Sequence, residues 1–74
     1  MSTMTLDCAG LNCPLPILRL SKAINAAASG ATIEMLATDP GSVKDVQAWA
    51  NQTGHNLLES RQENGRYTFV VRKN

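Results

Sequence analysis

The order of hydrophobic periodicities along the chain constrains its fold more than any other feature. Apolar and polar residues alternate over residues 4–8 and again over 31–38, and between them apolar residues recur at three- and four-residue steps from Pro14 to about Ala28. Alternation is typical of a half-buried strand, and the longer spacing is typical of a helix. A helix that joins two strands of one sheet predicts a parallel pair with a right-handed crossover.

Two glycines and one capping motif mark where the helices are expected to begin and end. Gly30 should stop the first helix and Gly54 the second, because glycine is favoured just past the last helical turn. Residues 39–42 form a DPGS turn, and Ser42 followed by Asp45 has the S-x-x-D form of a capping box. The packed faces are predicted to consist of Ile17, Leu20 and Ile24 with Ala27 or Ala28 in the first helix, and of Val43, Val46 and Ala50 with Trp49 at the edge in the second.

A hairpin is expected to close the chain. Residues 56–62 form a third strand, and the Asn64-Gly65 pair is a turn signal before a fourth alternating run at 66–73. Two helices on one face of a four-stranded sheet would bury the apolar side of every element. We therefore predict an α+β fold, a two-layer β-α-β-α-β-β sandwich with a four-stranded mixed sheet and two helices on one face, which forms a single domain over residues 1–74.

Charge and hydropathy argue against several kinds of partner. The chain carries a formal net charge of +1, whereas a dedicated nucleic-acid-binding domain usually has a basic patch or a high pI. No apolar run approaches the roughly 20 residues of a membrane-spanning helix. The first residues, MSTMTLD, lack the basic start and apolar stretch of a signal peptide. We expect a cytoplasmic protein that contacts neither a nucleic acid nor a membrane directly.

The chain has two cysteines, Cys8 and Cys13, whose C-x4-C spacing fits neither a disulfide scaffold nor a metal site. Small secreted scaffolds carry more cysteines. A zinc site needs a second pair of ligands, whereas His55 is the only histidine. There is no C-x-x-C motif, which argues against a dithiol oxidoreductase. We expect no metal and no cofactor, and each cysteine needs its own explanation.

Cys13 directly precedes two prolines at the predicted start of the first helix. With Cys13 as the N-cap, Pro14 occupies N1, where proline is favoured, and Pro16 occupies N3, where its missing N–H costs no helical hydrogen bond. The prolines then fix the helix start and hold the cysteine at its first position. The positive end of the helix dipole is expected to lower the pKa of the Cys13 thiol moderately, so that part of it is ionised near neutral pH.

The sequence contains no recognisable general base for Cys13. The only histidine lies 42 residues further along (55 minus 13), and a cysteine hydrolase needs a base beside its nucleophile. A sulfur carrier needs only one accessible and well-positioned sulfur. We therefore favour a protein that accepts a sulfane sulfur from one partner and gives it to another.

Other reactive or polar residues have structural explanations. Cys8 shares a strand face with Leu6, which predicts a small buried hydrophobe, and the alternative is a reversible disulfide with Cys13. Asp39 is predicted to be a turn residue rather than an acid. His55 is predicted to bind the last carbonyls of the second helix rather than to transfer protons.

The chain resembles the TusA/SirA-like family of small sulfur carrier proteins over nearly its whole length, and three segments carry the resemblance. LDCAGLNCPLPIL resembles the family's signature around its C-P-x-P motif, DPGSVKDVQAWANQTGH its second helix, and YTFVVRK its closing strand. The resemblance implies the same β-α-β-α-β-β sandwich. It also implies that Cys13 carries sulfur as a persulfide and that Pro14 and Pro16 form the rigid helix start.

The resemblance further implies partner proteins for a sulfurtransferase-type carrier. Sulfur would arrive from a cysteine desulfurase or a rhodanese, and would leave to a DsrE-like or TusBCD-like acceptor. Its destination would be 2-thiolation of a tRNA or oxidative sulfur metabolism. The rival interpretations are a regulatory binding module and an RNA-contacting domain, and the near-neutral charge counts against RNA.

Transfer brings two sulfur atoms into contact, so the surface around Cys13 is expected to dock partners. Its candidate residues are Leu11 and Asn12 in the preceding loop, Leu15 in the first helical turn and Arg19 one turn further on. Arg19 is expected to pair with an acidic rim on a partner and so to raise the association rate.

Overall fold

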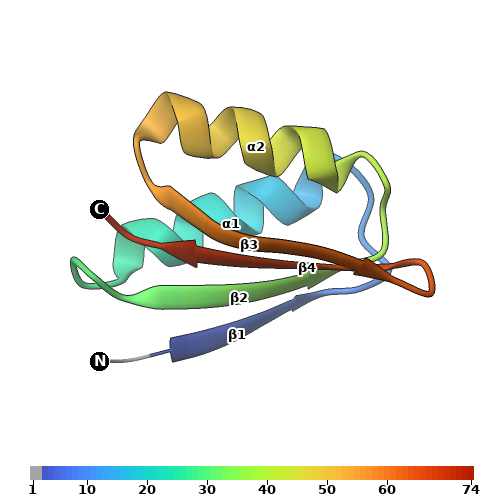
Figure 1. The fold of residues 1–74 in the computed structure, drawn as a ribbon, viewed down its shortest axis with the longest axis horizontal. Helices are drawn as coiled ribbons and strands as arrows, with labels where there is room; N and C mark the ends of the chain where they lie inside the picture. The colour runs from blue at the N-terminus through green and yellow to red at the C-terminus, as the bar shows by residue number, and fades with distance from the viewer. Residues whose placement is uncertain (1–2) are drawn as a thin grey trace.

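Residues 3–74, which the computed structural model describes, form six elements in the predicted order. These elements are β1 (Thr3–Cys8), α1 (Leu15–Ala26), β2 (Thr32–Ala37), α2 (Ser42–Thr53), β3 (Asn56–Glu63) and β4 (Arg66–Arg72). The four strands of this part of the chain make one mixed sheet, and both helices cover the same face of it (Figure 1). The predicted two-layer α+β sandwich is confirmed.

The strands lie side by side in the order β1-β2-β4-β3. β1 and β2 are parallel and are joined by α1, and β4 lies between β2 and β3 and is antiparallel to both. The Asn64-Gly65 turn joins β3 to β4 with φ values of 51° and 75°, as a two-residue hairpin turn of type I′ requires. The predicted parallel pair and hairpin are both present.

The core fills the space between the sheet and the two helices. The central strands β2 and β4 supply most of it, and β3 lies at an edge with exposed polar residues, as suits an edge strand. The predicted faces of the helices pack against the core, except that Ala27 and Ala28 lie beyond the end of α1 and do not belong to its packed face. Pro16 and Ser42 are buried there as well. The largest apolar side chains with less than 2% exposure are Phe69, Leu20, Ile24, Ile33, Met35, Val46 and Val71.

Helix α1 begins one residue later than the sequence predicts. Its N-cap is Pro14, not Cys13, and Pro16 stands at the second helical position. The Leu18 N–H donates to the Pro14 carbonyl over 3.1 Å as the first bond of the helical ladder. Pro16 still loses no helical hydrogen bond, because its position is among those without an intrahelical acceptor. The Cys13–Pro14 peptide bond is cis.

Helix α1 ends at Ala26, before the glycine that was expected to stop it. Ala27 has an extended backbone, and its N–H donates to the Ile24 carbonyl over 3.1 Å. The Lys73 ammonium donates to the Ala27 carbonyl over 2.6 Å, so a side chain from the end of the chain satisfies the end of the helix. Gly30, with φ +84°, belongs to the turn that follows, and its predicted role as the helix stop is wrong.

Helix α2 begins without the predicted capping box. Its N-cap is Gly41, and Ser42 is already the first helical residue. The Ser42 side chain is buried, and its hydroxyl has no hydrogen-bond partner among the described residues. The Asp45 N–H donates to the Gly41 carbonyl over 3.2 Å. Because the helix starts one residue early, the Ser42 hydroxyl does not cap it.

The end of α2 confirms one prediction and corrects another. Gly54 ends the helix with φ +79°, and its N–H donates to the Ala50 carbonyl over 2.9 Å. His55 does not bind the helix carbonyls. Its Nδ1 accepts the Asn74 N–H over 3.0 Å, and its ring centroid lies 5.4 Å from that of Trp49. The left-handed glycine closes the helix, so His55 serves instead to hold the C-terminal end of the chain.

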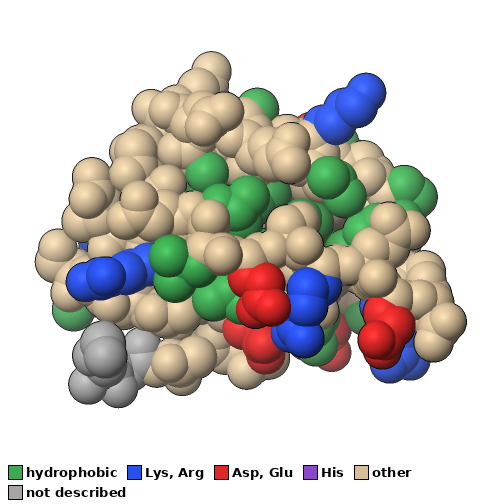
Figure 2. Space-filling view, viewed as in Figure 1, with side chains coloured by type: hydrophobic (Ala, Val, Ile, Leu, Met, Phe, Trp, Pro, Cys, Tyr) green, Lys and Arg blue, Asp and Glu red, His purple; other side chains and the backbone are tan. Residues whose placement is uncertain are grey.

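The surface mixes charges of both signs. In the view of Figure 2, acidic and basic side chains are interleaved along the strands of the sheet. Within residues 3–74, neither twelve-residue helix is long and apolar enough to cross a membrane.

Candidate functional site

The loop between β1 and α1 presents Cys13 at the surface, whereas Cys8 at the end of β1 is fully buried in the core. Both are free thiols. The prediction that Cys8 is a small buried hydrophobe is confirmed. Burial raises the pKa of the Cys8 thiol. The charge of Arg19 lowers this pKa, and the charge of Asp7 raises it. Cys13 is therefore the thiol that another protein can reach.

Asp45, in the first turn of α2, contacts the Cys13 sulfur directly. The Sγ–H of Cys13 donates to Oδ2 of Asp45 over 2.7 Å. The contact joins residues 32 positions apart in the chain, and it forms because α1 and α2 lie against each other on the sheet. Asp45 was predicted only as a capping residue, so the sequence interpretation missed this role.

Asp39, in the loop between β2 and α2, holds the backbone of Cys13. One carboxylate oxygen accepts the Cys13 N–H over 2.6 Å, and the other accepts the Gly41 N–H over 3.1 Å. The second bond spans two residues and confirms the predicted turn role. The first bond ties the two loops that flank the sulfur to each other.

The part of the β1–α1 loop that follows β1 is held by hydrogen bonds that its backbone N–H groups donate. The Gly10 N–H donates to Oγ1 of Thr38 over 2.9 Å, and the Leu11 N–H donates to the Cys8 carbonyl over 3.2 Å. Gly10 has φ +82°, a conformation that glycine adopts without strain. Together with the Asp39 bond, these contacts fix the path of the chain on which Cys13 lies.

The surroundings of the sulfur raise the pKa of the Cys13 thiol above its ordinary value. The hydrogen bond to Asp45 is the largest cause, followed by partial desolvation and then by the negative charges of Asp45 and Asp39. The expectation of a lowered pKa is wrong. Cys13 precedes the N-cap and so lies outside the first turn, where the helix dipole acts most strongly. Two carboxylates near the sulfur disfavour its anionic form.

The residues expected to dock partners differ in their exposure. Asn12, Leu15 and Arg19 are exposed, and Leu15 keeps 47% of its surface. Leu11 is half-buried and packs against the core. Leu18, which the sequence interpretation missed, is 58% exposed and lies three positions after Leu15, on the same side of α1. Both leucines fall outside the packed stripe of the helix. This position in the sequence pattern is the signal from which the exposure of Leu18 could have been predicted.

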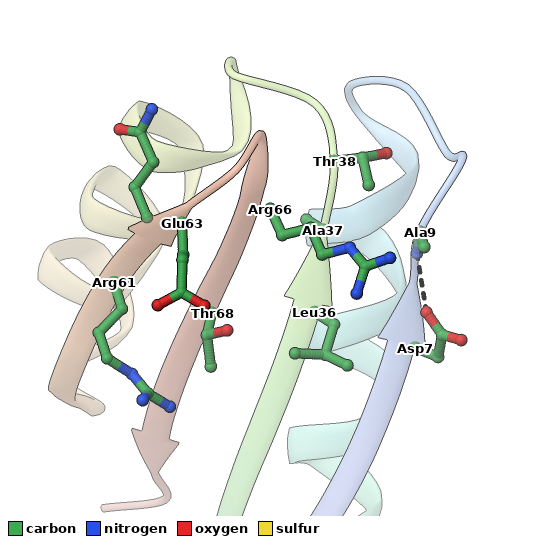
Figure 3. A pocket seen from close by; sticks show the side chains of 10 residues that line it. Asp7, Ala9, Leu36, Ala37, Thr38, Arg61, Glu63, Arg66 and Thr68 are labelled. Carbon is green, nitrogen blue, oxygen red and sulfur yellow. Dashed lines mark hydrogen bonds between the residues drawn. The ribbon is translucent and has the colours of Figure 1, made fainter.

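A separate cavity of about 640 Å³ lies on the helix-free face of the sheet (Figure 3). Cys13 does not line it. Arg61 at its edge is paired with Glu34 and Glu59 over 3.8 and 3.2 Å. Within residues 3–74, no three His, Cys, Asp or Glu side chains come together to hold a metal ion. The charged residues that line the cavity are Asp7, Arg61, Glu63 and Arg66.

Comparison with known proteins relates the chain to sulfur carriers. The profile of the family described as "Sulfurtransferase TusA" matches residues 4–73. The "Sulfur carrier protein TusA" of Allochromatium vinosum is 56% identical over 68 residues, which cover 92% of this chain and 90% of that protein. A "Putative sulfur carrier protein" of Neisseria meningitidis is 46% identical over 71 residues, 96% of each chain. The crystal structure of a SirA-like protein from Desulfitobacterium hafniense superposes with a TM-score of 0.81 at 25% identity, over 93% of this chain and 95% of that one.

Proposed function

This chain belongs to the TusA sulfurtransferase family of sulfur carriers, and we propose that Cys13 is the residue that holds the sulfur, as a persulfide. One observation carries the assignment. Of the two cysteines, Cys8 is 0% exposed and Cys13 is exposed in the loop just before α1, and a carrier sulfur must be reached by two different partners.

The transfer step is an exchange of one sulfur–sulfur bond for another. The Cys13 sulfur attacks the terminal sulfur of a persulfide on the donor protein. A new S–S bond forms on Cys13, the S–S bond of the donor breaks, and the donor cysteine leaves as a thiolate. The proton lost by Cys13 returns to the donor thiolate or to solvent, and no net oxidation takes place. Delivery to the acceptor is the same reaction with the carrier as the persulfide.

The partners in this proposal are a donor of the cysteine desulfurase or rhodanese type and a DsrE-like or TusBCD-like acceptor. The final destination is 2-thiolation of a tRNA or oxidative sulfur metabolism. The carrier itself does not contact the nucleic acid. We place it in the cytoplasm, where free thiols such as Cys8 and Cys13 stay reduced.

Replacement of the sulfur tests the assignment. We expect Cys13→Ser to abolish sulfur loading with little change in the free energy of unfolding, because a serine hydroxyl also donates to the Asp45 carboxylate. The measurement is mass spectrometry after incubation with a cysteine desulfurase and cysteine, without reductant. The wild type should gain one sulfur atom, located on the peptide that contains Cys13.

Two controls make the loading test decisive. Circular dichroism must show that Cys13→Ser is folded, and the variant must be incubated beside the wild type with the same donor. Equal loading of both proteins would refute Cys13 as the carrier. No observation favours the alternative of a regulatory or RNA-contacting module, so we propose no second function.

A further inference from the structure

The contact between Asp45 and Cys13 has no role in the transfer chemistry described above. A hydrogen bond of 2.7 Å from Sγ to a carboxylate oxygen is available only to the protonated thiol, because a thiolate has no hydrogen to donate. Ionisation of Cys13 therefore breaks this bond and also places a second negative charge against Asp45.

We propose that Asp45 is a positioning residue that holds the empty carrier in its protonated, less reactive form. The benefit to a carrier rests on the proposed function. The effect of Asp45 on the ionisation of the Cys13 thiol does not depend on that function. The thiolate is the nucleophile in reactions with alkylating reagents, oxidants and disulfides. A carrier that keeps its thiol protonated between encounters is spared these side reactions.

The other charged groups around the sulfur do not cancel the effect of Asp45. Asp39 from the β2–α2 loop bonds to the Cys13 N–H and adds to the negative field at the sulfur. Lys44, next to Asp45 on α2, is exposed to solvent. On α1, the charge of Arg19 lowers the pKa of the Cys8 thiol, whereas the main influences on the Cys13 thiol are those of Asp45 and Asp39. The negative charges of Asp45 and Asp39 therefore dominate the electrostatic environment of the Cys13 sulfur, in agreement with the raised pKa of its thiol.

The raised pKa of the Cys13 thiol lowers its reactivity near neutral pH. A thiol whose pKa lies above the ordinary value has a smaller thiolate fraction at every pH below that pKa. Removal of the Asp45 charge should move the ionisation of Cys13 to lower pH and so speed its reaction near neutral pH. A purely structural role for Asp45 would not move the pH profile in this direction.

The test is the alkylation rate of Cys13 as a function of pH. Iodoacetamide is uncharged, so the local charges do not steer it, and peptide mapping separates Cys13 from the buried Cys8. We expect Asp45→Asn to react about three- to tenfold faster than wild type at pH 7, with the midpoint of its profile at lower pH. Asparagine keeps an acceptor for the Sγ–H, removes the negative charge and adds an amide N–H that can donate to the thiolate, so both changes favour ionisation of Cys13.

Two further variants separate the charge at the sulfur from other effects. Glu59→Gln removes the same charge from β3, where the carboxylate pairs with Arg61, and should leave the profile at its wild-type position. Asp45→Glu keeps the charge and should stay closer to wild type than Asp45→Asn. An unchanged or raised midpoint in folded Asp45→Asn, or an equal shift in Glu59→Gln, would overturn the proposal. Because alkylation needs no sulfur donor, these outcomes do not depend on whether Cys13 carries sulfur.

Discussion

At the scale of single residues, the two cysteines show how position decides chemistry. Cys8 ends β1 with its side chain on the face that the helices cover, and it is fully buried. Cys13 lies five positions later in a loop (13 minus 8), with its sulfur against Asp45. A thiol in the core acts as a small apolar group, whereas a thiol on the surface is governed by the charges around it.

The burial of Cys8 leads to a prediction about stability. We expect Cys8→Ala to lower the free energy of unfolding by about 1 kcal/mol, because it leaves a small cavity in the core. Sulfur loading should stay near the wild-type level. Urea unfolding followed by circular dichroism gives the first quantity, and the desulfurase assay gives the second.

A second substitution distinguishes packing from chemistry at this position. Cys8→Ser buries a hydroxyl that needs a partner, so it should cost more stability than Cys8→Ala. If folded Cys8→Ala loaded no sulfur, Cys8 would have to take part in transfer, and its assignment to the core alone would be wrong.

At the scale of elements, the two helices end by different means. Helix α2 ends at a left-handed glycine, as the sequence predicts, whereas α1 ends at extended Ala27 with its carbonyl bound by the Lys73 ammonium. The first device acts within a few neighbouring residues and can be recognised in the sequence. The second uses a residue 46 positions away, which no local pattern reveals.

The left-handed conformation of Gly54 gives a prediction at the element scale. Its φ of +79° is unfavourable for a residue with a Cβ by about 1–2 kcal/mol. We expect Gly54→Ala to lower the free energy of unfolding by about 1 kcal/mol. Gly54→Asn is the matched variant and should lose less, because asparagine tolerates this conformation better than alanine. Equal losses in the two variants would show that the cost comes from contacts of the new side chain and not from its backbone.

At the scale of the whole molecule, the fold gathers three distant segments around one sulfur. The β1–α1 loop carries Cys13, the β2–α2 loop brings Asp39, and the first turn of α2 brings Asp45. The exposed Leu15 and Leu18 belong to the helix that starts just after Cys13. An exposed apolar residue next to the proposed transfer site is a candidate for partner docking.

Exchange of a leucine for an aspartate tests the docking surface. We expect Leu15→Asp to slow sulfur transfer between carrier and partner protein about tenfold. It should slow iodoacetamide alkylation of Cys13 by no more than the added negative charge explains. Leu58→Asp is the control, since Leu58 on β3 is a similarly exposed leucine, at 57%, on another element. It should leave both rates unchanged.

The ratio of the two rates decides the meaning of the Leu15 result. If transfer and alkylation slow in parallel, Leu15 acts on the reactivity of the sulfur and the docking role should be dropped. If Leu58→Asp slows transfer as much as Leu15→Asp, the effect comes from the added charge in general and not from the surface beside Cys13.

The sequence by itself determined the elements and their order, because periodicity and turn preferences act between residues only a few positions apart. The alternation in β2 and β4, the stripe of Leu20 and Ile24, and the Asn64-Gly65 turn all belong to this class. The position of Cys13 just before a helix was also predicted from its neighbours in the chain, since the two prolines mark a helix start.

Only the tertiary structure decided the electrostatic environment of that cysteine. The dipole argument considered one helix in isolation and predicted a lowered pKa for Cys13. The packing of α1 beside α2 brings Asp45 to the sulfur from 32 positions away, and the β2–α2 loop brings Asp39 to its backbone from 26. The hydrogen bond from the Cys13 sulfur to Asp45 is the largest cause of the raised pKa, and the negative charges of Asp45 and Asp39 add to it. The helix whose dipole was expected to lower this pKa begins beyond Cys13. Contacts of this kind exist only once the chain is folded, so the sign of the pKa shift depends on the fold.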